Sequence, residues 1–266
     1  MNSEIVLSND QSPTTPEDLE DMQNVPYQRA IGSLMYAATS TRPDIAFAVA
    51  ILSQFMRNPG HTHWEAVKDV IRYLKGTADF QLTLGTSDTG LEAYVDADWA
   101  SQPHRRSISG YTVYLHGSPI AWSARKQSLV TLSTTEAEYI ALTAVAREVL
   151  HLQVLLEEIY GPVSSPIPIY CDNQGAIALA SKTRFHARTK HIDIRYHFVR
   201  HLIRTRILDL SYCPTEENVA DIFTKALSRP RLRKLRAELK IGPARGGVLE
   251  SDSDRTGNDM PHTVMH

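Results

Sequence analysis

The sequence predicts an α/β fold in which helices cover a mixed β-sheet, preceded by a small N-terminal helical lobe. Three observations support this fold class. Apolar residues recur at helical spacing between residues 27 and 75, alternate with polar residues between residues 91 and 97, and then follow successive helix and strand patterns after residue 133. Antiparallel strands followed by alternating helices and strands indicate a mixed sheet with helices packed on it.

The N-terminal part divides into two segments. Residues 1–24 are rich in Ser, Pro, Thr, Asp and Glu, which predicts a disordered segment. Residues 25–85 form the predicted helical lobe, because Ile45, Val49 and Leu52 recur at helical spacing and a second such pattern follows Trp64. A stretch of Gly, Ser and Thr at residues 85–90 separates the lobe from the next domain.

The predicted sheet domain covers residues 90–228. Its first strand is indicated by Leu91, Ala93 and Val95, which alternate with polar residues. A long helix is expected after Ser133, because Ser133 and Glu136 have the spacing of a capping box. The other predicted elements are strands at 111–115, 120–123, 167–171 and 207–212, and helices at 173–180, 191–205 and 216–227. A basic helix at 229–241 and a disordered tail at 242–266 complete the chain.

Composition narrows the range of protein classes. The 266 residues are 42% hydrophobic and carry a formal net charge of −2, which is typical of a globular protein. No stretch reaches the roughly 18 uninterrupted apolar residues of a membrane span, so no membrane partner is expected. Cys171 and Cys213 are too few for a disulfide framework or a cysteine-based zinc site. We therefore expect an intracellular protein.

Positive charge is concentrated in one part of the chain. Residues 184–206 contain seven Lys and Arg side chains against one acid, Asp193. Such a patch favours a phosphate backbone as partner, because each neutralised phosphate releases a counterion. The same run of basic residues would also occur on a solvated helix face that binds no partner.

Several acidic residues stand at unusual positions. Glu138 lies at the end of the apolar stripe of the long helix, whereas Glu136 falls on its polar side. Burial of an unpaired carboxylate is costly, so Glu138 needs a cation or a hydrogen-bonded partner unless it escapes at the sheet edge. Asp172 directly follows an apolar strand, where ligands often bind in α/β sheets, but it is also a favoured helix N-cap.

Two further positions are less distinctive on their own. Asp96 and Asp98 share one face of the first strand, which suits a metal site or a solvated strand end equally. The spacing of Asp221 relative to the apolar residues of the last predicted helix indicates a surface position. Together these acids offer hard oxygen ligands, which suit Mg²⁺ or Mn²⁺. Two such ions about 4 Å apart would support phosphodiester hydrolysis.

Six motifs occur in order along the chain: YVDADWA at 94–100, RSISGY at 106–111, STTEAEYIAL at 133–142, DNQGAI at 172–177, KHIDIRYHFVR at 190–200 and NVADIFTK at 218–225. Together they resemble the ribonuclease H region of copia-type LTR retrotransposon Pol polyproteins. The resemblance extends over residues 27–240, including the helical lobe, which is similar to the segment that joins the reverse transcriptase to the nuclease.

The resemblance implies a five-stranded ribonuclease H-like sheet and cleavage of the RNA strand of an RNA–DNA hybrid. It implies that Asp96, Glu138, Asp172 and Asp221 are the catalytic residues and bind two Mg²⁺ or Mn²⁺ ions, and it selects Asp96 over Asp98. An upstream reverse transcriptase domain is the expected protein partner, because the chain lacks the Tyr-X-Asp-Asp string of a polymerase.

The resemblance also suggests which residues contact nucleic acid. Discrimination of the 2′-hydroxyl is expected from side chains beside the acids, and phosphate binding from basic residues. These residues are Asn173 and Gln174, and Arg125, Lys126, Lys190, His191, Arg195, His197 and Arg200.

The sequence departs from the family pattern in two places. Residues 101–104 replace expected Gly and acidic residues, which affects a turn and no metal ligand. No histidine occurs at 212–218, where relatives use one for proton transfer. His191 or His197 is a candidate to replace it, but the structural or phosphate-binding role of a helix histidine is the favoured interpretation.

Two other functions fit the same residues. A truncated retroelement remnant would bind nucleic acid or a partner without cutting. A transposase or integrase of related fold would use three acids and cut DNA. The substrate that is cleaved separates these alternatives.

Overall fold

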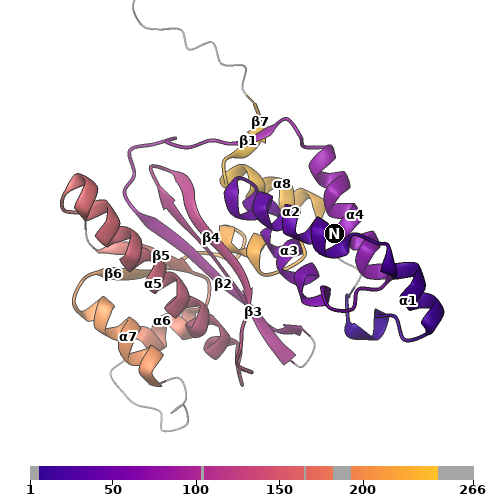
Figure 1. Ribbon diagram of the computed structural model, residues 1–266. Coiled ribbons are helices and arrows are strands. Elements are labelled where there is room, and N and C mark those ends of the chain that lie inside the picture. Colours follow the sequence, from indigo (N-terminus) through magenta and orange to yellow (C-terminus); the bar gives the residue numbers. More distant parts are fainter. Residues whose placement is uncertain (1–5, 103–104, 165, 182–192, 245–266) are drawn as a thin grey trace, which may run out of the picture.

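The computed structural model describes residues 6–102, 105–164, 166–181 and 193–244 (Figure 1). The chain first forms a helical lobe and then a larger domain around a five-stranded sheet. This arrangement confirms the fold class expected from the sequence.

The main sheet is mixed and has the strand order β4-β3-β2-β5-β6. The first three strands, β2 (Glu92–Gln102), β3 (Arg106–Leu115) and β4 (Ser118–Lys126), form an antiparallel meander. Strands β5 (Ile167–Cys171) and β6 (Leu208–Tyr212) are parallel to β2 and are reached through helical crossovers. Such crossovers are required because parallel neighbours cannot be joined by a tight turn.

Helices cover both faces of this sheet, and the alternation along β2 assigns its side chains to one face or the other. Ala93 and Val95 pack in the core with α5 (Thr134–Tyr160), α6 (Gln174–Ser181) and α7 (Asp193–Arg204). Tyr94 packs on the opposite face with the 3₁₀ helix η5 (Val219–Phe223) and α8 (Arg229–Glu238). The sheet therefore separates two cores, and side chains near the carboxyl end of β2 can meet residues from both.

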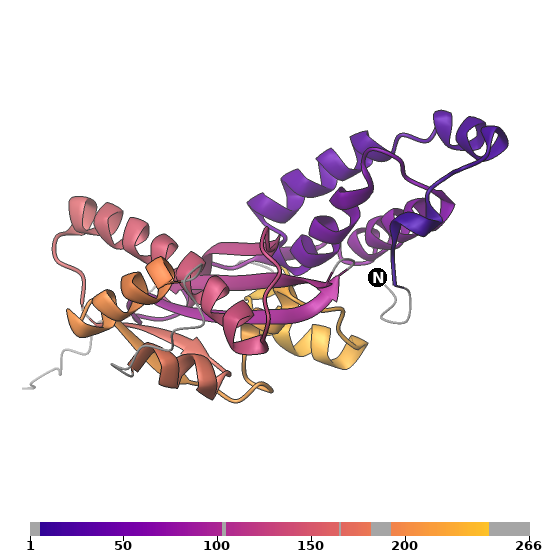
Figure 2. The same cartoon turned by 90° about the horizontal axis from the view of Figure 1, so that it is seen from below.

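The lobe is a separate helical core packed against β4. It contains the helices α1 (Pro16–Gln23), α2 (Tyr27–Ser40), η2 (Pro43–Ile45), α3 (Ala46–Leu52), η3 (Ser53–Phe55) and α4 (His61–Lys75). Figure 2 shows these helices at one end of the molecule, with α5, α6 and α7 at the other. The Trp122 indole donates a hydrogen bond to the Ala38 carbonyl at 2.7 Å, and Lys126 Nζ lies 2.6 Å from Gln54 Oε1. These contacts attach the lobe to the sheet.

The structure differs from the sequence-based boundaries at both ends. Residues 6–24, predicted to be disordered, include η1 (Asn9–Gln11) and α1, and Leu7 and Met22 are buried. The predicted basic helix at 229–241 ends at Glu238, and β7 (Ile241–Pro243) pairs with β1 (Phe80–Leu82). Both segments acquire structure by packing on other parts of the chain, which their composition does not reveal. The disordered tail predicted at 242–266 is wrong at its start, where residues 242 and 243 belong to β7, and residues 245–266 lie outside the described residues.

Among the described residues, α5 is the one helix with the length and apolar composition of a membrane span. Its residues Ala141, Val145 and Val149 are fully buried against the sheet. The central position of α5 in a protein core accounts for its apolar character.

Candidate metal centre

Asp96 lies on β2 just beyond the last residue that pairs with β5. The register ends at Val95 and Cys171, so Asp96 and Asp172 occupy equivalent positions on adjacent strands. Asp96 as a whole residue is 2% exposed, and its carboxylate accepts a hydrogen bond from the Thr224 hydroxyl. Asp98, which the residue spacing could not distinguish from Asp96, belongs to neither group of potential metal ligands among the described residues.

Glu138 lies in the first turns of α5 with 5% of its surface exposed, as its place on the apolar stripe predicts. Glu136, which was expected on the polar side, is also buried, and this expectation is wrong. Its carboxylate accepts a hydrogen bond from the Leu132 amide at 2.7 Å, while its own amide donates to Ser133 Oγ at 3.2 Å. Glu136 therefore stabilises the start of α5, and only Glu138 reaches the acidic cluster.

Asp172 follows β5 and is half-buried. It is held by the Thr215 hydroxyl, which donates to Asp172 Oδ2 at 2.7 Å. The neighbouring Asn173 accepts the Ala176 amide at 2.9 Å. Because Asn173 provides this side-chain contact at the start of α6, the helix-capping role considered for Asp172 falls to its neighbour.

Asp221 is buried, with 4% exposed, and the surface position expected for it is wrong. The predicted helix at 216–227 is instead the short 3₁₀ helix η5. Asn218 anchors this turn, because its Nδ2 donates to the Val95 carbonyl at 2.9 Å and its Oδ1 accepts the Ala220 amide. Gly110, opposite Asp96 on β3, allows the close approach, since a Cβ atom there would lie 2.6 Å from Thr224 Cγ2.

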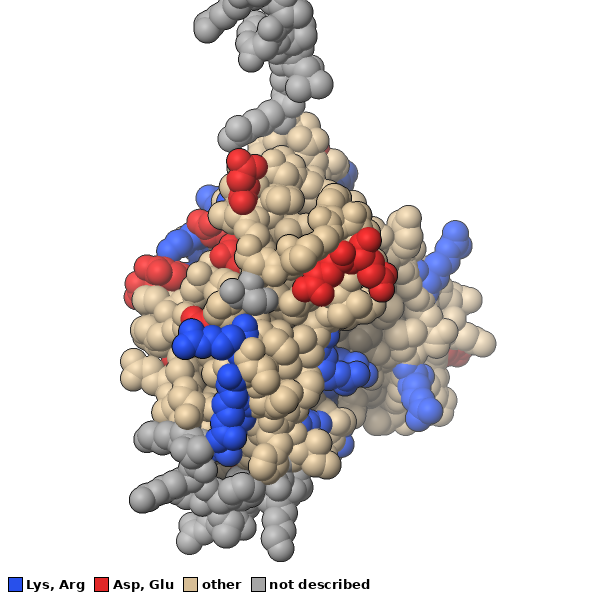
Figure 3. Space-filling view, turned by 90° about the vertical axis from the view of Figure 1, so that its left-hand side faces the viewer, with Lys and Arg blue, Asp and Glu red and all other residues tan. Residues whose placement is uncertain are grey.

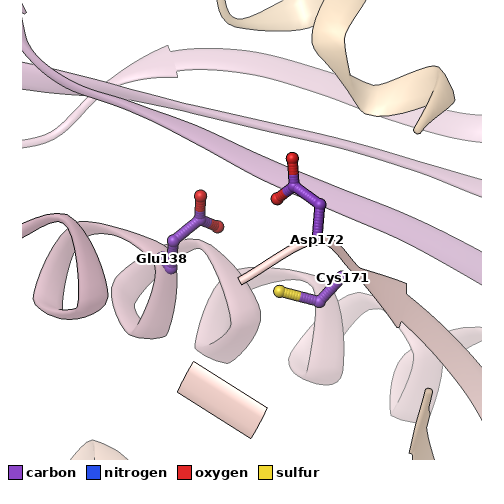
Figure 4. A group of neighbouring side chains, drawn as sticks. All are labelled: Glu138, Cys171 and Asp172. Carbon is purple, nitrogen blue, oxygen red and sulfur yellow. The ribbon is translucent and has the colours of Figure 1, made fainter. Parts of the chain in front are cut away.

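The four predicted acids meet at one end of the sheet. Potential ligand atoms of Asp96, Asp172 and Asp221 all lie within 4.8 Å of one another, and so do those of Glu138, Cys171 and Asp172. Asp172 belongs to both groups and links them. Figure 4 shows the carboxylates of Glu138 and Asp172 directed to the same side, with the Cys171 thiol beneath them.

Burial and mutual repulsion raise the proton affinity of this cluster. Burial raises the pKa of Asp96 to about 6, with Asp221 and Asp172 adding to the effect while Lys225 and Thr224 oppose it. Burial, followed by the charges of Asp96 and Asp172, raises the pKa of Glu138 well above its ordinary value. A bound divalent cation would favour the ionised forms of these carboxylates.

Sequence reasoning missed the cations beside this cluster. Lys225 Nζ lies 2.8 Å from Asp221 Oδ1 and 3.6 Å from Asp96 Oδ2. Arg231 Nη2 lies 3.0 Å from Asp221 Oδ2 and also donates to the Thr215 carbonyl at 2.6 Å. Lys225 stands four residues after Asp221, a spacing that could have suggested the ion pair, whereas Arg231 approaches from another helix.

The residues present fit a divalent metal of the hard, oxygen-binding type. Four carboxylates supply the oxygen ligands that Mg²⁺ and Mn²⁺ prefer. Glu138 Oε2 is buried and accepts no hydrogen bond in the described structure, which is consistent with a role as a metal ligand. Burial raises the pKa of the Cys171 thiol, which disfavours the thiolate that zinc would bind.

The predicted nucleic-acid residues have different environments. Gln174 and Arg125 are exposed, and Asn173, Lys126 and Arg195 are partly exposed. His197 is exposed on α7. Lys190 and His191 lie outside the described residues.

Arg200 does not fit the predicted phosphate contact. It is 8% exposed, and its guanidinium donates to the Leu179 carbonyl at 2.9 and 3.1 Å. The helical period turns this side chain toward α6, so it connects α6 and α7 and does not face a ligand.

A groove beside α5 is a second candidate surface. Arg125 and Lys126 line it from β4, together with Arg147 and His151 from α5 and the hydroxyls of Ser109 and Ser123. On another side of the molecule, that of α7, Lys and Arg side chains gather in the lower half of the face and acids in the upper half (Figure 3). Exposed positive charge therefore occurs on more than one side of the domain.

The strand order, the helical crossovers and the four converging acids define a ribonuclease H-like domain. No family model matches the sequence. Over 224 residues and 84% of this chain, the sequence is 46% identical to the retrovirus-related Pol polyprotein from transposon TNT 1-94 of Nicotiana tabacum. Over 228 residues, it is 42% identical to that from transposon RE2 of Arabidopsis thaliana. The chain belongs to the retrovirus-related Pol polyproteins of copia-type transposons.

The aligned region is a small part of these polyproteins. It spans 17% of the TNT 1-94 protein and 16% of the RE2 protein. Half of the chain is also 47% identical to 95% of the secreted RxLR effector protein 161 of Plasmopara viticola. Among solved structures, LC11 ribonuclease H1 isolated from compost matches 55% of this chain and 96% of its own, with 17% identity and a TM-score of 0.39.

Proposed function

We propose that this protein is a metal-dependent endoribonuclease that hydrolyses the RNA strand of RNA–DNA hybrids during reverse transcription of a retroelement. The observation that carries the proposal is the convergence of Asp96, Glu138, Asp172 and Asp221, from four separate segments, at one end of a ribonuclease H-like sheet. Burial of several carboxylates against each other is unfavourable unless cations compensate them. A metal-dependent function accounts for this arrangement.

The four carboxylates would hold two Mg²⁺ or Mn²⁺ ions. When bound, these ions would supply the electrophilic assistance that phosphodiester hydrolysis requires. The protein fixes its ligands in advance: Thr224 holds Asp96, Thr215 holds Asp172, and Asn218 anchors the turn that carries Asp221. Such positioning reduces the reorganisation needed for the reaction.

Substrate binding would use side chains around the cluster. The Asn173 amide nitrogen and the exposed Gln174 stand directly after Asp172, where they could donate to a 2′-hydroxyl. The groove lined by Arg125 and Lys126 would bind backbone phosphates without reading sequence. The proposed substrate is therefore a hybrid duplex bound through its backbone.

The relatives suggest the setting of this activity. We propose that an upstream reverse transcriptase domain delivers the hybrid, since the matched proteins are Pol polyproteins. An intracellular location belongs to the same proposal, because Cys171 and Cys213 are free thiols.

Purified protein incubated with Mg²⁺ and a hybrid labelled on the RNA strand tests the proposal. Wild-type protein should cut the RNA, and Asp172→Asn should lose the activity. Equal cutting by both proteins would refute the mechanism. Absence of cutting by a folded, metal-binding protein would favour the silent remnant, and cutting of duplex DNA in place of the hybrid would favour a transposase-like enzyme.

A further inference from the structure

We propose that Lys225 is a built-in cation of the acidic cluster, so that the site binds one divalent ion tightly and admits a second only by competition with the Lys225 ammonium. This inference rests on the proposed function, because it concerns how the same four carboxylates are loaded. It assigns a positioning role to a residue outside the predicted tetrad.

The position of Lys225 supports this role. Its ammonium lies 2.8 Å from Asp221 Oδ1 and 3.6 Å from Asp96 Oδ2, so it bridges two of the four acids. Both carboxylates are almost fully buried, with side-chain exposures of 6% and 3%. A positive charge at this distance in a protected site is attracted more strongly than it would be in water.

The local backbone keeps Lys225 in place. Asp221 and Lys225 are four residues apart, and the Lys225 amide donates to the Asp221 carbonyl at 3.3 Å. Thr224, between them, donates its hydroxyl to Asp96. Because the turn that presents Asp221 also presents Lys225, the cation accompanies the ligand it neutralises.

The remaining acids have no such cation within salt-bridge distance in the described structure. Glu138 Oε2 is buried and has no hydrogen-bond partner, and Asp172 accepts a hydrogen bond from the neutral Thr215 hydroxyl. Lys225 acts on Glu138 and Asp172 only from beyond salt-bridge distance, so an incoming divalent ion meets less compensated charge there than at Asp96 and Asp221. We infer that the first ion binds beside Glu138 and Asp172.

The second ion must compete with the lysine. The Lys225 side chain is 37% exposed, so the ammonium can move into solvent while its backbone stays fixed. Withdrawal of the ammonium would free Asp221 Oδ1 and Asp96, while Arg231 would still pair with Asp221 Oδ2. Potential ligand atoms of Asp96, Asp172 and Asp221 lie within 4.8 Å of one another. Loading of this group should therefore need a higher concentration of metal ion.

Mn²⁺ titration followed by electron paramagnetic resonance, without nucleic acid, tests the inference on the full chain. Wild-type protein should bind one ion tightly and a second at least about tenfold more weakly. Lys225→Met should tighten the second ion so that the two affinities converge. Lys225→Arg, which keeps the charge, should retain the wild-type pattern.

Lys234→Met is the matched control, because the exposed Lys234 donates to the Glu216 carbonyl and touches none of the four acids. This variant should bind Mn²⁺ as the wild type does. A second ion that is no tighter in Lys225→Met than in Lys234→Met would overturn the inference, and so would convergent affinities in Lys225→Arg. Hybrid cleavage is measured separately. If the protein does not cut the hybrid but Lys225→Met binds the second ion more tightly, the inference about Lys225 holds and the proposed nuclease function does not.

Discussion

The two halves of the acidic cluster contain the same kind of ligand but differ in how their charge is compensated. Asp96 and Asp221 have Lys225, Arg231 and the Thr224 hydroxyl around them. Glu138 and Asp172 have the Thr215 hydroxyl, a backbone hydrogen bond from Ala97 to Glu138, and one buried oxygen without a partner, but no cation within salt-bridge distance among the described residues. The difference shows how a cluster of acids can fold without metal: cations from the chain compensate one half, and the other half is left for an external ion.

Removal of a ligand from the half formed by Glu138 and Asp172 should have the largest effect on metal affinity. Glu138→Gln should weaken Mn²⁺ binding by more than about 100-fold, since even residues behind the ligands cost about 10- to 100-fold in metal affinity. The same change should stabilise the metal-free protein, because a buried repulsive charge is lost. Isothermal titration and thermal unfolding measure the two effects.

Glu136→Gln is the control for this prediction, because Glu136 is buried on the same helix but accepts the Leu132 amide. It should retain metal binding. Equal weakening by both substitutions would remove the distinction between the two glutamates.

The pH dependence of stability should also depend on metal. Asp96 and Glu138 bind protons more tightly in the folded protein than in the unfolded chain, since their folded pKa values are raised, that of Asp96 to about 6. This contribution to stability is complete below the unfolded pKa and is lost as pH rises through about 6. Asp96 alone accounts for up to about 3 kcal/mol.

Urea unfolding with chelator at pH 5 and pH 7.5 measures the part of this loss that falls between these two pH values, since pH 5 already lies above the unfolded pKa. Mg²⁺ should restore stability at pH 7.5 because it favours the ionised carboxylates. Asp96→Asn should reduce the pH dependence. A metal-free protein whose stability is the same at both pH values would contradict the prediction.

Displacement of η5, which carries Asp221, should have an intermediate effect on stability and on metal binding. Gly110→Ala would place a Cβ atom 2.7 Å from Phe223 Cβ and force η5 away from β3. We expect a loss of about 2 kcal/mol in unfolding free energy, typical of overpacking in a dense core, and weaker metal binding through Asp221. Gly90→Ala, where no atom lies within 4 Å of the new Cβ, should leave both unchanged. Wild-type metal affinity in Gly110→Ala would show that Asp221 contributes little.

Loss of one compensating cation should have the smallest effect on stability. Arg231→Met removes donors from the Asp221 carboxylate and the Thr215 carbonyl and should cost about 1 kcal/mol in urea unfolding. Arg233→Met changes an exposed residue on the same helix and should have little effect. Identical unfolding free energies for the two variants would mean that Arg231 is not part of the compensation.

Much of the fold and the acidic cluster could be predicted from the sequence. The period of two near Leu91 and the helical stripe ending at Glu138 are local patterns, and they correctly gave the first strand and the burial of that glutamate. The errors have one physical cause. Glu136 was expected on the polar face of its helix, Asp221 at the surface by its spacing, and Arg200 in contact with phosphate, yet all three are buried by contacts with other elements or with a loop.

The sequence by itself determined the order of the five strands of the main sheet and the long helix α5, because hydrophobic periodicity is a property of neighbouring residues. It also determined the kind of ligand, since the chain supplies carboxylates and only two cysteines. The resemblance named the four carboxylates, but only the tertiary structure shows how they converge and which cations accompany them. Gly110 lets η5 contact β3, and Arg231 reaches Asp221 from α8, so the charge balance of the site follows from packing between distant segments, which local patterns do not encode.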